Sequence, residues 1–240
     1  MNNSQAQLHK LLSAFGARAK DGELVLDAGA GSQPYRKHFS HLRYESADLP
    51  GCGDQTYECD LHNIPVSSDR YSLVICSQVL EHVQKPFEVL RELNRVCKPG
   101  GLIFYSVPFY YFEHNIPYDY YRYTSYGCRL LAEEAGFEVV KLGALESYLS
   151  TVSLQLSLIK KDLPRLDQFV QQDLCDVETA RKYDAFIKCI PNISRYLSDI
   201  ESSMIAQDIP LCTTGHPKNN YVIARKTKIS LRKKLVNLML

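Results

Sequence analysis

The chain has 240 residues, of which 45% are hydrophobic and 23% are charged. This composition excludes a largely disordered or membrane-embedded chain and supports one sizeable core. The formal net charge is only +1, which gives no overall positive field of the kind that nucleic-acid binding uses, so we expect no nucleic-acid partner. The eight cysteines are scattered without a C-x-x-C pair or a zinc-like spacing, which predicts reduced thiols.

The two ends of the chain give separate predictions. The first residues show neither the basic nor the apolar region of a secretory signal, and no apolar run approaches the roughly 18 residues of a spanning helix. We therefore expect a cytoplasmic protein. The tail at 226–240 pairs basic with apolar residues, which fits either a helix docked on its own domain or peripheral contact with an anionic membrane surface. The oligomeric state is left open.

An amphipathic helix around Leu8–Phe15 precedes a regular alternation of apolar runs and helical patterns. Such alternation is typical of β-α-β units. We predict an α/β fold with a Rossmann-like, mainly parallel seven-stranded sheet flanked by helices. The seven predicted strands lie near Leu24–Leu26, Tyr44–Ala47, Tyr57–Cys59, Ser72–Cys76, Leu102–Val107, Glu138–Leu142 and Asn220–Ala224.

Two of the flanking helices have clear start and stop signals. Pro86–Val96 carries proline in its first turn and apolar residues on one face, and Lys98–Gly101 follows as a stop. Thr124 is expected to cap a second helix, which Gly136 then ends before the next strand. Both helices are predicted to pack against the sheet.

A helical insertion is predicted before the last strand. Helical patterns replace the strand signal over 146–216, interrupted by Pro164, Pro191 and Pro210. We interpret this segment as a cap within a single domain that covers 1–240, because no linker of low complexity separates it.

The most informative motif is the turn that follows the first strand, Asp27–Pro34. Gly29 and Gly31 allow a tight turn and a close approach of a ligand to the backbone, and Pro34 suits the first turn of a helix whose free N–H groups receive an anionic group. A dinucleotide site needs a third glycine where Pro34 stands, so NAD is the weaker alternative. A purely structural strand-to-helix turn also uses glycine.

Acidic residues follow the next two predicted strands. Asp48 comes after the second strand, where a carboxylate can accept hydrogen bonds from ribose hydroxyls. Asp60 and the apolar Leu61 come after the third, where they can meet an adenine. Each acid alone is also a common solvated loop residue, but together with the glycine turn they favour a nucleoside-containing ligand.

The chain resembles the class I S-adenosylmethionine-dependent methyltransferases, in particular a type-11-like group of small-molecule enzymes. The resemblance rests on ordered blocks between Leu24 and Val140, namely Val25–Gly31, Asp60–Leu61 with Ile64–Pro65, Tyr71–Val83 and Arg91–Gly101. It implies S-adenosylmethionine as the cofactor.

The resemblance also implies roles for particular residues. Glu81–His82 is typical of the family, and we interpret His82 as a structural hydrogen-bonding group rather than the base. The implied cofactor-binding residues are Asp27, Gly29, Ala30 and Gly31 for the methionine end, Asp48 for the ribose, Asp60 and Leu61 for the adenine, and Gln78 and Leu80 beside the cofactor.

The binding site for the molecule that accepts the methyl group is predicted after the fifth strand, since ligands of open α/β sheets lie beyond the carboxyl ends of the strands. The segment 106–124 is rich in tyrosine and phenylalanine, which suit stacking on a ring or ordinary packing. His114 is the predicted general base for an acceptor hydroxyl. Asp119 and Arg122, three residues apart, either form a structural pair or orient the acceptor.

The expected reaction is methylation of an oxygen on a sugar, glycoconjugate or polysaccharide-biosynthesis intermediate, because Pro117–Thr124 resembles a pattern in enzymes that build polysaccharides. A quinone-like or other small metabolite is the alternative acceptor, and a non-catalytic S-adenosylmethionine-binding module is the alternative function. We predict metal-independent transfer, because the carboxylates lie on separate strand ends without a convincing histidine partner. The insertion is expected to act as a lid that selects the acceptor.

Overall fold

The structure is a computed structural model that describes residues 3–162, 176–207 and 217–227. It divides into two compact units, which we call the sheet unit (Met1–Leu145 and Asn219–Leu240) and the helical unit (Glu146–Lys218). The helical unit covers the segment for which the sequence predicts an inserted cap. The predicted amphipathic tail lies outside the described residues beyond Thr227.

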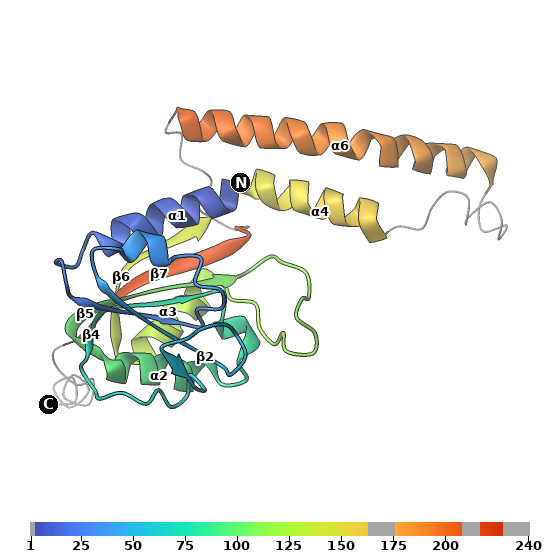
Figure 1. The fold of residues 1–240 in the computed structure, drawn as a ribbon. Helices are drawn as coiled ribbons and strands as arrows, with labels where there is room; N and C mark the ends of the chain where they lie inside the picture. The colour runs from blue at the N-terminus through green and yellow to red at the C-terminus, as the bar shows by residue number, and fades with distance from the viewer. Residues whose placement is uncertain (1–2, 163–175, 208–216, 228–240) are drawn as a thin grey trace, which may run out of the picture. The chain divides into compact units, whose positions relative to one another are not determined.

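Within the described residues, seven strands form one sheet in the order β3-β2-β1-β4-β5-β7-β6 (Figure 1). Pairs among β1 to β5 are parallel, whereas β7 runs antiparallel to β5 and β6. The predicted Rossmann-like, seven-stranded sheet is confirmed. Its strands are mainly parallel, but the sheet is mixed because β7 is antiparallel to both of its neighbours. The strands are β1 Leu24–Ala28, β2 Arg43–Asp48, β3 Tyr57–Glu58, β4 Tyr71–Ser77, β5 Cys97–Pro108, β6 Phe137–Leu145 and β7 Asn219–Lys226.

Helices cover both faces of the sheet (Figure 1). The helices α2 (Pro86–Val96) and α3 (Ser125–Glu134) pack on one face, and α1 (Asn3–Gly16) packs on the other. Because successive strand residues point to opposite faces, Leu26 joins the α2 side and Val25 joins the α1 side. Burial on both faces explains why the central strands β1 and β4 read as apolar runs.

The start signals of α2 and α3 act as the sequence predicts, whereas the stop of α2 differs. The helix α2 begins at Pro86 and ends at Val96, although the strand β5 starts directly after it, at Cys97, so the predicted stop at Lys98–Gly101 lies within that strand. The Oγ1 of Thr124 accepts a hydrogen bond from the Gly127 N–H at 3.0 Å, which caps α3.

The predicted helix after the glycine turn does not form. In place of an α-helix that begins at Pro34, the chain makes turns and a four-residue 3-10 helix, η1 (Arg36–Phe39). Only Phe39 of this helix is buried, and β2 already begins at Arg43. The connection is therefore too short and too polar to pack a longer helix, and no α-helix N-terminus is available there to bind an anionic group.

The helical unit consists, in its described part, of two helices that pack along each other, α4 (Tyr148–Asp162) and α6 (Val177–Ala206). Pro191 was predicted to interrupt the helical segment, but it lies inside the 30-residue α6. Packing along α4 outweighs the backbone hydrogen bond that proline removes. Among the described residues, no helix is long and apolar enough to span a membrane.

Buried charge lies near the start of α4. The Glu146 carboxylate, 2% exposed, pairs with Lys218 Nζ at 3.1 Å. The carboxylate of Glu201, 1% exposed, accepts the Ser147 N–H at 3.0 Å and the Ser150 hydroxyl. The first contact joins the two ends of the helical unit to each other, and the contacts of Glu201 join the start of α4 to α6.

Candidate active site

Predicted site residues lie at or just beyond the carboxyl ends of five adjacent strands, β3, β2, β1, β4 and β5. The parallel direction of these strands brings their carboxyl ends to one edge of the sheet. The first group surrounds the glycine turn after β1. The second group lies where the segments after β4 and β5 meet.

The glycine turn requires glycine at two positions for different reasons. Gly29 has φ +76°, and a Cβ there would overlap the side chain of Val79. Gly31 has φ +50°, and nothing lies within 4 Å of the place where its Cβ would be. The backbone at Gly29 is thus packed against the segment after β4, whereas the backbone at Gly31 faces open space that a ligand can enter.

Asp48 holds the glycine turn in place from the end of β2. Its Oδ2 accepts the Gly31 N–H at 2.8 Å, and its Oδ1 accepts the Leu49 N–H at 2.8 Å. Each carboxylate oxygen retains a further lone pair for a hydroxyl donor. Gln55 Nε2 donates to the Gly31 carbonyl at 2.7 Å, so the loop after β2 folds back on the turn.

Asp27 is buried at the end of β1 rather than facing the open space. Its side chain accepts the Tyr44 hydroxyl at 2.6 Å, and the residue is 1% exposed. Burial raises the pKa of Asp27 to about 6, and the nearby Asp48 carboxylate adds to this rise while the Tyr44 hydrogen bond opposes it. Asp27 therefore supports the glycine turn from inside the protein, through its hydrogen bond with Tyr44.

Replacing Asp27 with Asn is expected to remove a pH-dependent loss of stability. Asp27 has a pKa of about 6 in the folded chain and about 3.9 when unfolded. Its protonated form favours the folded state below pH 4, and this contribution is lost as the pH rises through 6. A shift of two units corresponds to about 3 kcal/mol. Urea unfolding of both proteins from pH 4 to 7 measures the difference, and a constant difference would contradict the prediction.

The other predicted cofactor residues differ in exposure. Ala30 and Leu61 are buried at 4% and 7% exposure. Leu80 is fully buried in the core, so its side chain supports the site instead of lining it. Asp60 has an exposed carboxylate that accepts the backbone N–H of His62 at 2.9 Å and contacts its ring. Gln78, at the end of β4, donates to the Ser106 hydroxyl at 3.1 Å.

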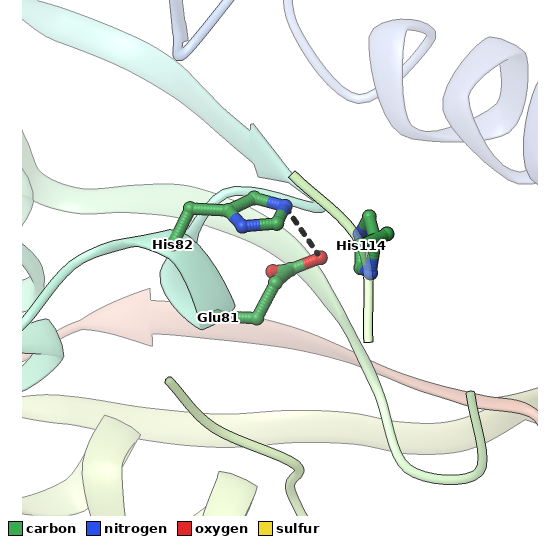
Figure 2. Close-up of side chains that lie close together, drawn as sticks. All are labelled: Glu81, His82 and His114. Atoms are coloured by element: carbon green, nitrogen blue, oxygen red, sulfur yellow. Dashed lines mark ion pairs between the residues drawn. The ribbon is translucent and has the colours of Figure 1, made fainter. Parts of the chain in front are cut away.

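The second group centres on Glu81, His82 and His114. Glu81 and His82 belong to the short helix η2 (Leu80–His82) after β4, and His114 lies in the segment after β5. One ligand-type atom from each residue lies within 4.8 Å of the others. Figure 2 shows the Glu81 carboxylate between the two imidazoles.

Glu81 is an unusual buried acid. Its residue is 0% exposed, and neither carboxylate oxygen accepts a hydrogen bond from another of the described residues. His82 Nε2 lies 3.9 Å from Glu81 Oε1, beyond hydrogen-bond distance. Burial raises the pKa of Glu81 to about 7, although the Arg122 charge lowers it.

Backbone carbonyls fix the orientation of both imidazoles. His82 Nδ1 lies 2.7 Å from the Tyr118 carbonyl, which only accepts, so Nδ1 carries the proton and the lone pair lies on Nε2. The Asn115 amide nitrogen Nδ2 lies 3.5 Å from this Nε2, a long contact. His114 Nδ1 lies 3.2 Å from both the Phe112 carbonyl and Asp119 Oδ2. The same reasoning leaves the lone pair of His114 on Nε2.

Asp119 and Arg122 form a bidentate ion pair, with Oδ1 and Oδ2 each 2.7 Å from a guanidinium nitrogen. Hydrogen bonds from Arg122 hold the pKa of Asp119 well below its usual range. Arg122 also donates to the carbonyls of Tyr111, Phe112 and Tyr121. The structure thus brings His114, Asp119 and Arg122 together, with Asp119 and Arg122 shaping the loop that carries His114.

Tyrosines attach the same loop to η2. The Tyr123 hydroxyl donates to the Leu80 carbonyl at 2.8 Å, the Tyr120 N–H donates to the Glu81 carbonyl at 2.8 Å, and the Tyr121 hydroxyl donates to the Gln84 carbonyl at 2.9 Å. Other aromatic rings of the loop remain exposed, namely those of Tyr110, Phe112 and Tyr118.

Sequence reasoning missed Glu81 as a functional candidate. An acid directly before a histidine at the carboxyl end of a predicted central strand was the available signal. Its burial without a partner depends on the fold of the later loop, which no local pattern describes.

The sheet order, the glycine turn and the acid that holds it are features of the class I methyltransferase fold. A family model described as a methyltransferase domain matches residues 2–142. The chain belongs to this methyltransferase domain family.

Individual relatives are distant. The ubiquinone biosynthesis O-methyltransferase of Sodalis glossinidius (strain morsitans) is 31% identical over 88 residues, which are 37% of this chain and only 34% of that relative. A structure of a putative sarcosine dimethylglycine methyltransferase from Galdieria sulphuraria has a TM-score of 0.54 and 17% identity, covering 92% of this chain and 86% of that one.

A structure of the Haemonchus contortus phosphoethanolamine N-methyltransferase 2 in complex with S-adenosyl-L-methionine has a TM-score of 0.55 and 15% identity. It covers 92% of this chain and 53% of that one. At such low identity, the likeness to both solved structures shows the fold alone.

Proposed function

We propose that this methyltransferase transfers the methyl group of S-adenosylmethionine to a hydroxyl oxygen of a small acceptor with an aromatic ring. The observation that carries this proposal is the buried Glu81 between His82 and His114, beside exposed aromatic side chains. Polar groups of this kind bind a hydroxyl, and the rings suit stacking on the acceptor. The name of the Sodalis relative, an O-methyltransferase of ubiquinone biosynthesis, supports oxygen as the methylated atom.

The glycine turn fits the cofactor. The open space at Gly31 allows the methionine part to approach the backbone, and Asp48 combines a fixed position with free lone pairs for ribose hydroxyls. Asp60 and Leu61 offer a polar and an apolar contact for the adenine. When bound, S-adenosylmethionine supplies a methyl group on a positively charged sulfur, which is already activated for transfer.

The protein's own groups position the acceptor and receive its proton. The acceptor oxygen forms a bond to the methyl carbon while the carbon–sulfur bond breaks and its electron pair stays on the sulfur. The hydroxyl proton passes to a lone pair of the Glu81–His82–His114 cluster, with His114 Nε2 the base that the sequence suggests. Correct alignment of two bound reactants contributes up to about 7–11 kcal/mol.

Calorimetry and an acceptor panel test this proposal. We expect binding of S-adenosylmethionine and S-adenosylhomocysteine but not of NAD. With radiolabelled methyl donor, we expect label on dihydroxybenzoates and no label on sugars or sugar nucleotides. Absence of donor binding would overturn the proposal as a whole, whereas label on sugars alone would overturn its aromatic acceptor and favour the glycoconjugate that Pro117–Thr124 suggests.

A further inference from the structure

We propose that Glu81, His82 and His114 form a binding site for a first-row divalent metal ion, which holds the acceptor by its oxygen atoms. The sequence predicted metal-independent transfer, because no carboxylate had a convincing histidine partner. The fold supplies that partner, since the loop after β5 brings His114 back to η2 (Figure 2).

The ligand set and its spacing suit such an ion. Two imidazole nitrogens and one carboxylate oxygen are ligands that Mn²⁺, Co²⁺ and Zn²⁺ accept, and three protein ligands leave positions open for a substrate. Metal–ligand bonds of about 2.1 Å place ligand atoms roughly 3–4 Å apart. The observed limit of 4.8 Å needs only small side-chain rotations to reach this range.

Glu81 provides the independent observation. A buried carboxylate without a hydrogen-bond donor is costly, and such groups in native proteins are paired or coordinate a metal. Glu81 is 0% exposed, neither of its oxygens has a hydrogen-bond partner among the described residues, and its carboxylate points between the two imidazoles (Figure 2). A cation at this position supplies the missing partner.

Groups outside the cluster prepare the two histidines for metal binding. The Tyr118 carbonyl holds His82 by Nδ1, and the Asp119 carboxylate with the Phe112 carbonyl holds His114 by Nδ1. Both lone pairs therefore lie on Nε2, and a metal ion at His82 would replace only the long contact from Asn115 Nδ2 at 3.5 Å. A carboxylate on the far nitrogen orients a histidine ligand. This assignment makes His114 a ligand in place of the base suggested above.

The metal would select acceptors with two adjacent oxygen atoms. Two open positions on one ion bind the oxygens of a catechol or another vicinal diol, which fixes one oxygen for transfer. The bound hydroxyl becomes more acidic, so its proton leaves to water before or during formation of the oxygen–carbon bond. This acceptor class rests on the proposed function, whereas metal binding itself does not.

Titration with MnCl₂ in the absence of donor and acceptor tests the site, because Mn²⁺ avoids the thiols of exposed cysteines such as Cys52. Electron paramagnetic resonance of free Mn²⁺ is expected to show one bound ion per chain. Glu81→Gln and His114→Ala are each expected to weaken binding at least tenfold. His38→Ala is the matched control, because His38 and His9 form another close histidine pair, with ring nitrogens 2.6 Å apart.

Binding that His38→Ala abolishes, or that Glu81→Gln and His114→Ala leave unchanged, would overturn the proposal, as would no binding at millimolar Mn²⁺. If a variant fails to fold, a crystal of the unchanged protein soaked in MnCl₂ tests the site instead. Anomalous density for Mn²⁺ is then expected next to the Glu81 carboxylate. Density elsewhere only would refute the site. Intact binding of S-adenosylmethionine in the same protein separates this outcome from failure of the proposed function.

Discussion

Replacing Gly31 with Ala is expected to lower the affinity for S-adenosylmethionine at least tenfold, with only a small loss of stability. Gly31 has φ +50°, and its new Cβ would enter open space rather than protein atoms. The strain of the left-handed backbone costs about 1–2 kcal/mol. The methyl group would occupy the space in which we place the cofactor, so binding would suffer beyond this strain. Calorimetry with S-adenosylhomocysteine and urea unfolding measure the two effects.

Two other glycines serve as controls for this prediction. Gly22 has φ +77° and also faces open space, but it precedes β1 at the opposite end of the strand, so Gly22→Ala should cost similar stability and leave cofactor affinity unchanged. Gly29→Ala should lose more stability than either, because its Cβ would overlap Val79, and overpacking adds about 1–3 kcal/mol. Equal cofactor affinity in Gly31→Ala and Gly22→Ala would show that the turn does not face the cofactor.

The sheet was predictable because its signals are local. The strands β1, β4, β5 and β7 are largely buried on both faces, and apolar residues dominate their centres. The helix α2 carries its own start signal at Pro86 and its own apolar face. The α-helix expected at Pro34 does not form, and the short segment before β2 explains why. A glycine turn and a proline give a helix a place to start, but the segment to Arg43 holds too few apolar residues to bury one.

The candidate site was less predictable, because its key contacts join residues far apart in the chain. Glu81 and His114 are neighbours because several contacts, among them those of Tyr120 and Tyr123, attach the loop after β5 to the backbone of η2. A run of tyrosines has the same appearance in the sequence whether its hydroxyls bind backbone carbonyls or a ligand. The position of His114 after β5 was predictable from topology, but the burial of Glu81 without a partner was not.

Replacing Arg122 with Ala is expected to destabilise the protein by on the order of 3 kcal/mol. The Asp119 side chain is 3% exposed, and loss of its bidentate partner leaves a nearly buried carboxylate without a cation. The carbonyls of Tyr111 and Phe112 lose their donor as well. Because the loop that carries His114 loosens, Mn²⁺ affinity should fall, while affinity for S-adenosylhomocysteine at the separate glycine turn should not change.

Arg122→Lys and the double variant Asp119→Asn with Arg122→Ala show which role Arg122 has. Lysine keeps the charge but not the planar fork, so it should restore only part of the stability. The double variant should be more stable than Arg122→Ala alone, because it leaves no buried charge behind. If Arg122 instead orients the acceptor, Arg122→Ala would raise the acceptor KM and leave both the free energy of unfolding and the Mn²⁺ affinity unchanged. The sequence alone left these two roles open, and unfolding measurements separate them without an identified acceptor.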